Sequence, residues 1–244
     1  MKKVLAVGMG VVLAVVVVLS ALAQSDATMT IAVEAAPQSA MNFRFSGSVL
    51  TGGAGDAGAS IDDFYLDDAA PDDGDAYGVS KVFTVPVGSV YSFSQAAVSG
   101  WYVTAIDCVG TGTATVNLAQ RSVTIDTSGG DVTCTFRNEK AGTITTRKHR
   151  EANGVIGRQA PEVWLGSWMM QVRTLGGSLV TQAGTNSLGW VSFSVAPGDY
   201  QVCEVMKSGW KHWANPANLC QPVTVGAGGS AEVAFGNCLI ASCP

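Results

Sequence analysis

The sequence has little histidine and little charge. Only two of its 244 residues are histidines, and 14% are charged. A zinc site or histidine-based catalysis therefore has few imidazoles to use. The formal net charge of −5 excludes a typical nucleic-acid binder, which needs a basic face. No H-E-x-x-H, G-x-S-x-G or P-loop motif occurs, and we predict that the protein is not a turnover enzyme.

Helical periodicity is also missing. No segment after residue 23 keeps a helical period for three turns. Short runs instead alternate apolar and polar residues at period two, with glycine and serine between them, as half-buried strands do. These runs are residues 81–85, 91–93, 132–136, 190–195 and 231–235. The pattern predicts an all-β fold built from β-sandwiches.

The N-terminus has the order of a secretory signal peptide. Lys2 and Lys3 precede an apolar run over residues 4–19, and a small-residue site ends at Ala23. We expect residues 1–23 to be removed, which leaves a mature net charge of 12 − 19 = −7 and no membrane segment. The alternative is an uncleaved membrane anchor, since the apolar run is near the lower limit for a bilayer span.

A set of short motifs occurs twice in the same order. The first set is V-P-V-G-S-V-Y, G-W and F-R-N, ending at residue 138; the second is V-A-P-G-D-Y, G-W and F-G-N, ending at residue 237. This repeat predicts two tandem domains, residues 24–140 and 141–244. Their short junction is expected to restrict the angle between them and to give a stubby rod.

These motifs resemble the prealbumin-like B-type domains of bacterial surface adhesins and pilins, namely the SpaA-like, Cna-B and SdrD-B groups. The resemblance covers nearly all of residues 28–239 and is closer in the second copy. It implies two prealbumin-like (Ig-like) β-sandwiches that serve as a stalk, spacer or adhesive module, secreted or at the cell surface. The partner it implies is a surface protein or a glycan, which the sequence does not name.

Many domains of these groups form an isopeptide bond between a lysine on the first strand and an asparagine on the last, promoted by a glutamate. The matching positions in the second copy are Lys148, Asn237 and Glu204. Alternation places each of them on the same strand face as apolar neighbours, so all three could enter one interior. Burial there would lower the pKa of the lysine and raise that of the glutamate.

The alternative is that Lys148 belongs to a solvated basic run, residues 147–150, and that Glu204 lies on a surface strand. The first copy departs from the pattern, because Val33 and Gln95 stand at the lysine and glutamate positions. Asn138 remains there, but no cross-link is expected without an amine.

Six cysteines permit 15 pairings, and an exported chain should form disulfides. The division into two units selects among the pairings, although a metal site or a redox pair is the functional alternative. The predicted pairs are Cys108–Cys134, Cys203–Cys220 and Cys238–Cys243.

Two further clusters suggest weaker sites. Residues 62–75 are rich in aspartate, and Asp72, Asp73 and Asp75 faintly resemble a Ca²⁺ loop. A solvated acidic loop is the simpler interpretation. No other cofactor is expected. Trp210 and Trp213 follow a glycine turn and could form an exposed contact for a carbohydrate or another ligand, with core packing as the alternative.

The two histidines, His149 and His212, have no evident acidic partner in the sequence. We predict that both are surface residues.

Overall fold

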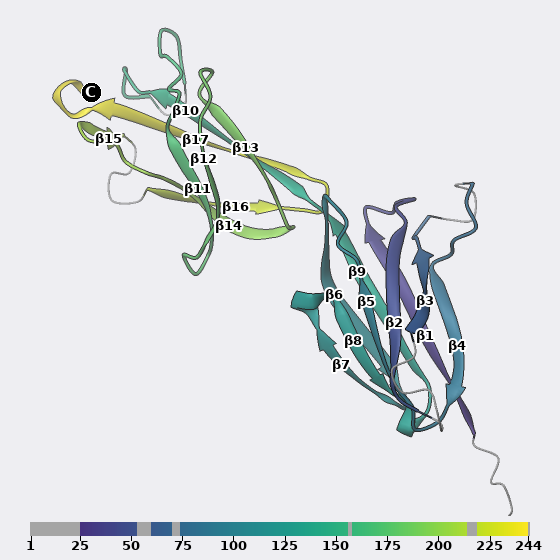
Figure 1. Ribbon diagram of the computed structural model, residues 1–244. Helices are drawn as coiled ribbons and strands as arrows, with labels where there is room; N and C mark the ends of the chain where they lie inside the picture. Colours follow the sequence, from purple (N-terminus) through teal and green to yellow (C-terminus); the bar gives the residue numbers. More distant parts are fainter. Residues whose placement is uncertain (1–24, 53–59, 70–73, 156–157, 214–218, 244) are drawn as a thin grey trace, which may run out of the picture.

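The computed structural model describes residues 25–52, 60–69, 74–155, 158–213 and 219–243 (Figure 1). These residues form strands joined by turns, and three single-turn 3₁₀ segments: η1 (Leu118–Gln120), η2 (Thr127–Gly129) and η3 (Ile240–Ser242). The all-β prediction is confirmed. The predicted signal peptide lies outside the described residues. Among the residues that are described, no helix is long and apolar enough to cross a membrane.

The first domain is a sandwich of two sheets. One sheet has the order β4-β1-β9-β6, with strands Ser80–Pro86, Asp26–Ala36, Val132–Lys140 and Trp101–Gly110. The other has the order β3-β2-β5-β8-β7, with strands Ser60–Leu66, Phe43–Thr51, Val90–Gln95, Ser122–Asp126 and Thr113–Asn117.

The second domain repeats this arrangement. Its first sheet has the order β13-β10-β17-β15, with strands Trp190–Val195, Gly142–Arg150, Ser230–Leu239 and Trp210–His212. Its second sheet has the order β12-β11-β14-β16, with strands Leu179–Gly184, Met169–Thr174, Gly198–Glu204 and Cys220–Val225. Strand for strand, the order is that of the first domain without β7, so the sequence repeat is also a structural repeat.

The register of the strands repeats as well. The first and last strands of each domain are parallel neighbours. In the first domain Val33 lies opposite Phe136, and in the second Lys148 lies opposite Phe235. The residues two positions further along the last strands are Asn138 and Asn237. The two domains therefore place equivalent side chains at equivalent points of their cores.

Each sandwich buries the apolar face of its strands, as period-two alternation requires. The first core is rich in phenylalanine: Phe45 stacks on Phe64 at 5.3 Å between ring centroids and meets Phe136 edge-on at 5.0 Å. The second is built around Trp168, Met170 and Phe235, each almost fully buried. Full burial of such a side chain contributes about 1.5–3 kcal/mol, and the cores hold the two sheets of each domain together.

Three disulfides are present, and they join the cysteines that the sequence paired. Cys108–Cys134 links β6 to β9 and Cys203–Cys220 links β14 to β16, each between residues directly opposite one another. Cys238–Cys243 closes the turn after β17. The first disulfide lies in the first domain and the other two lie in the second, so none joins the two domains.

The two domains follow one another along the long direction of the molecule (Figure 1). Only Ala141 separates the last strand of the first domain, β9, from the first strand of the second, β10. The Ala141 amide donates to the Gly100 carbonyl at 2.8 Å, and the Gly228 amide of the second domain donates to the Lys140 carbonyl at 2.9 Å. The junction is therefore held by backbone hydrogen bonds on both sides.

Candidate functional site

The candidate site is a cluster of three polar side chains inside the second sandwich. Lys148 comes from β10, Glu204 from the end of β14 and Asn237 from β17. Their exposed fractions are 0%, 3% and 0%. Alternation explains the burial, since each follows buried residues at two-residue steps along its own strand. Lys148 is therefore not part of a solvated basic run.

One carboxylate oxygen joins the three groups. Glu204 Oε2 lies 3.2 Å from Lys148 Nζ and accepts a hydrogen bond of 2.8 Å from Asn237 Nδ2. Lys148 Nζ also donates to the backbone carbonyl of Phe235 at 3.2 Å and lies 4.6 Å from the centroid of the Trp168 ring. The amine and the amide therefore meet on one side of a single glutamate in an aromatic pocket.

Burial controls the protonation of this cluster. Burial lowers the pKa of the Lys148 amine to about 8, although the Glu204 carboxylate opposes the change. Burial also raises the pKa of Glu204, against the influence of Lys148 and of the Asn237 hydrogen bond. Both shifts favour the uncharged forms, so a neutral amine and a protonated carboxyl are more accessible here than in water.

The equivalent place in the first domain holds a neutral amide pair. Gln95 Nε2 donates to Asn138 Oδ1 at 2.5 Å, and Asn138 Nδ2 donates back to Gln95 Oε1 at 3.2 Å. Val33 occupies the lysine position and is 5% exposed. Within the described part of this domain no amine reaches Asn138.

The prediction that both histidines lie at the surface is wrong. His149 is 3% exposed and His212 is 6% exposed. His212 packs edge-on against Phe235, and its Nε2 lies 4.0 Å from Glu204 Oε1 at the border of the cluster. Burial lowers the pKa of His212, with Lys148 adding to the shift. The burial of these two histidines could not be predicted from the sequence, because the neighbours of a strand residue are known only when the pairing of the strands is known.

The tryptophans named as possible ligand contacts are only partly accessible. Trp210 is half-buried and meets the buried Trp168 edge-on at 5.4 Å between ring centroids. Trp213 is also half-buried. Trp210 therefore contributes to the second core, as the packing alternative predicted.

Of the suggested Ca²⁺ ligands, Asp72 and Asp73 lie outside the described residues. Asp75 is exposed, and its Oδ1 accepts a hydrogen bond from the Tyr77 amide at 2.9 Å. Among the described residues, the one group of three or more potential ligands is His149, Glu151 and Glu162, far along the chain from Asp75.

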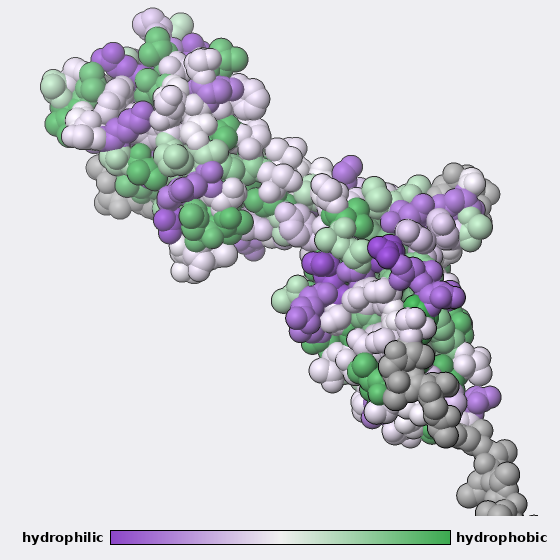
Figure 2. All heavy atoms as spheres, viewed as in Figure 1, coloured by the Kyte–Doolittle hydropathy of each residue, from purple (hydrophilic) through white to green (hydrophobic). Residues whose placement is uncertain are grey.

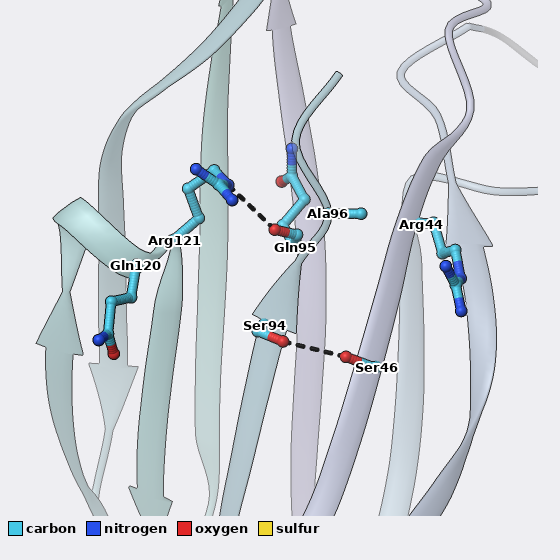
Figure 3. Close-up of a pocket in the computed structure, with 7 residues that line it drawn as sticks. All are labelled: Arg44, Ser46, Ser94, Gln95, Ala96, Gln120 and Arg121. Carbon is cyan, nitrogen blue, oxygen red and sulfur yellow. Dashed lines mark hydrogen bonds between the residues drawn. The ribbon is translucent and has the colours of Figure 1, made fainter. Parts of the chain in front are cut away.

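The surface offers a shallow pocket on the first domain. It is lined by Arg44, Ser46, Ser94, Gln95, Ala96, Gln120 and Arg121 (Figure 3). Arg121 Nε donates to the Gln95 backbone carbonyl, and Arg44 pairs with Asp63, so both guanidinium groups are already engaged. On the face shown in Figure 2, hydrophobic residues are scattered among polar ones over both domains.

Residues 29–140 match the family model of a prealbumin-like fold domain. The second domain repeats the strand order and register of that segment. The chain therefore contains tandem prealbumin-like β-sandwich domains, and the resemblance seen in the sequence is confirmed.

Several solved structures are similar at low identity. The minor pilin of Streptococcus agalactiae is 10% identical, with 88% of this chain and 96% of that chain covered and a TM-score of 0.39. The shaft pilin SpaA of Lactobacillus rhamnosus GG is 8% identical, with 88% and 98% covered and a TM-score of 0.36. The Bacillus anthracis TIE protein is 13% identical, with 87% of this chain but 34% of that chain covered and a TM-score of 0.35. A comparison with curated proteins finds no match.

Proposed function

We propose that this protein is a secreted or cell-surface structural and adhesive module, a stalk or spacer that carries load. In this proposal residues 1–23 are removed, and residues 24–140 and 141–244 fold as separate domains. The match of residues 29–140 to a prealbumin-like domain supports this role. Its partner would be a surface protein or a glycan.

The observation that carries the proposal is the pairing of the first and last strands in each domain. β1 lies beside β9, and β10 beside β17, in parallel. In a parallel pair the chain enters at one end of the sheet and leaves at the other, so tension on the termini acts along the strands. Such tension loads all the hydrogen bonds between the two strands together, which resists separation better than opening them one at a time.

A covalent bond between Lys148 and Asn237 would reinforce this strand pair in the second domain. In the reaction, the neutral Nζ attacks Asn237 Cγ while a protonated Glu204 polarises the amide carbonyl. A new C–N bond replaces the bond from Cγ to Nδ2. One of the two amine protons passes by way of Glu204 to the leaving nitrogen, and the other stays on the new amide. Ammonia is released, and the Glu204 carboxyl is regenerated.

The position of that bond matters as much as its strength. It would connect β10 directly to β17 and bypass the loop between them, a sequence separation of 237 − 148 = 89. Tension would then pass through covalent bonds, and nearly all of the second domain would be shielded from extension.

Intact mass under reducing conditions tests the cross-link. We expect the chain to be lighter than its sequence by one ammonia, and Lys148→Met and Glu204→Gln to restore the full mass. Lys211→Met, which changes an exposed lysine on β15, is the matched control and should keep the deficit. Tandem mass spectrometry must place the loss at residues 148 and 237, because cyclisation of an N-terminal Gln24 also expels ammonia. A full mass in the folded parent chain would overturn the cross-link.

Ligand binding through Trp210 and Trp213 is the less supported alternative, because Trp210 packs against Trp168. Glycan binding that disappears in the Trp210→Ala/Trp213→Ala double variant would favour it.

A further inference from the structure

A second buried polar cluster lies on the opposite face of strand β10 from Lys148. Its members are His149, Glu151 and Glu162, which are 3%, 2% and 2% exposed. Successive residues of a strand point to opposite faces, so His149 faces away from the sandwich core that holds Lys148. The chain after β10 folds back over this outer face, since the Leu165 amide donates to the Lys148 carbonyl at 3.0 Å. The cluster is enclosed between the sheet and this returning segment.

The imidazole of His149 is buried without a hydrogen-bond partner on either ring nitrogen. Its Nε2 lies 3.7 Å from Glu151 Oε2, beyond hydrogen-bond distance. A buried polar atom without a partner is costly, and nearly all such atoms in folded proteins are satisfied by protein, water or an ion. A group that binds the His149 ring nitrogen near Glu151 would therefore also lie close to the carboxylates.

The two glutamates are held in place by the backbone. Glu162 accepts hydrogen bonds from the Ala152 amide at 3.0 Å and from the Gln159 amide at 2.8 Å. Glu151 Oε1 accepts from the Gly154 amide at 2.9 Å, which leaves Oε2 directed toward His149. Carboxylates fixed in this way by their other contacts are typical of metal ligands.

The charge of the cluster is not balanced by the chain. Across the described residues, no lysine or arginine forms an ion pair with Glu151 or Glu162. Two buried carboxylates beside an imidazole without a hydrogen bond therefore lack positive charge, which a divalent cation would supply.

The backbone also makes room for a close approach. On Gly236 of β17, a side-chain Cβ would stand 2.8 Å from His149 Nε2 and 3.4 Å from Glu151 Oε2. Only glycine leaves that space open next to the ring nitrogen and the carboxylate.

We propose that His149, Glu151 and Glu162 bind one divalent transition-metal ion of the zinc class. One potential ligand atom from each residue lies within 4.8 Å of the others. Zinc bonds of about 2.0–2.2 Å place tetrahedral ligands roughly 3.3 Å apart, so a modest closure of the side chains completes the site. One imidazole with two carboxylates suits zinc better than Ca²⁺ or Mg²⁺, which prefer oxygen ligands alone. The ion would fasten the segment after β10 to the outer face of the sheet.

The experiment is a calorimetric titration of the chelator-treated full chain with zinc chloride. We expect one ion per chain, and we expect Glu162→Gln to weaken binding at least tenfold. That variant keeps one side-chain oxygen, which can accept one of the two backbone hydrogen bonds of Glu162. A preserved thermal transition would show that it is folded. Glu232→Gln, which alters an exposed glutamate of the same domain, is the matched control and should bind like the parent.

A spectroscopic measurement does not depend on any variant. X-ray absorption of the zinc-loaded parent chain should show one nitrogen and two carboxylate oxygens at about 2.0–2.2 Å from the metal. No zinc binding, a metal without an imidazole ligand, or equal affinity in folded Glu162→Gln would each overturn the proposal. Equal affinity would direct attention to other acids, such as those at residues 62–75.

Discussion

The two domains share one architecture, and one of their differences lies at an equivalent site in the core. At equivalent positions the first has Val33, Gln95 and Asn138, and the second has Lys148, Glu204 and Asn237. The asparagine is common to both. In the first domain it pairs with a neutral amide, and in the second with a carboxylate that also contacts an amine.

This difference indicates that the fold accommodates either a neutral amide pair or a charged group at this place. An amide pair satisfies the buried asparagine by mutual hydrogen bonds, with no desolvated charge. The buried lysine and glutamate carry a desolvation cost that an amide pair avoids, and the proposed cross-link would account for their presence.

The largest contrast is expected under force. In single-molecule stretching of the oxidised chain, the first domain should unfold while the cross-linked second domain does not extend. In Lys148→Met the second domain should also unfold. With Cys203–Cys220 intact, it should release about 89 − 17 = 72 residues, which is roughly 240 Å of extended chain.

Reduction provides the internal standard for that measurement. Breaking Cys108–Cys134 frees a loop with a sequence separation of 26, and the first domain should lengthen by roughly 90 Å on unfolding. Two unfolding steps in the oxidised parent chain would contradict the expected contrast.

The next effect concerns thermodynamic stability. Closing a loop of 89 residues is worth roughly 4–5 kcal/mol in the chain-entropy model. Lys148→Met should lower the free energy of unfolding of the second domain by about this amount, measured by guanidinium denaturation. The guanidinium concentration at which the first domain unfolds should not change. An unchanged unfolding transition of the second domain would count against the cross-link.

Grafting the triad tests whether position alone is sufficient. The double variant Val33→Lys/Gln95→Glu places the missing amine and carboxyl opposite Asn138. We expect it to lose one further ammonia, located by tandem mass spectrometry between residues 33 and 138. The single variant Val33→Lys should lose no further ammonia, and its first domain should be less stable, because the new amine is buried without a partner. A folded double variant of full mass would show that the first core lacks something besides these residues.

The smallest effect concerns the amide pair. Asn138→Ala leaves Gln95 buried with its side-chain partner removed, and we expect a loss of about 1–3 kcal/mol in the first domain. Replacing both residues by leucine should cost less than that. Ser46→Ala, which breaks an exposed hydrogen bond to Ser94, is the control and should change stability by less than about 0.5 kcal/mol. Chemical denaturation measures all three.

Much of the fold could be predicted from the sequence because alternation at period two is a local property. The runs at residues 81–85 and 190–195 lie within β4 and β13, and the repeated motifs mark equivalent strands. The predicted direction of Lys148, Glu204 and Asn237 into one interior also follows from parity along each strand. The glycine of each G-W motif, Gly100 or Gly209, has a positive φ, which explains why that residue precedes the strand.

What the sequence could not predict depends on contacts between distant segments. The prediction that His149 lies at the surface failed because this residue is buried by a segment that folds back near Trp164 and Leu165. The approach of Glu162 to His149 and Glu151 likewise depends on that return, although the H-x-E spacing of the first two residues is visible in the sequence. No local pattern indicates where an irregular segment will pack.

The single residue between β9 and β10 has a consequence for reach. Only one alanine lies at the joint, and hydrogen bonds hold the chain on either side of it. The linker can therefore extend very little before a force on one domain is transmitted to the other. The length of a chain connected in this way is set by the number of its domains. The distance it spans would change in fixed increments as units are added or removed, rather than continuously with tension.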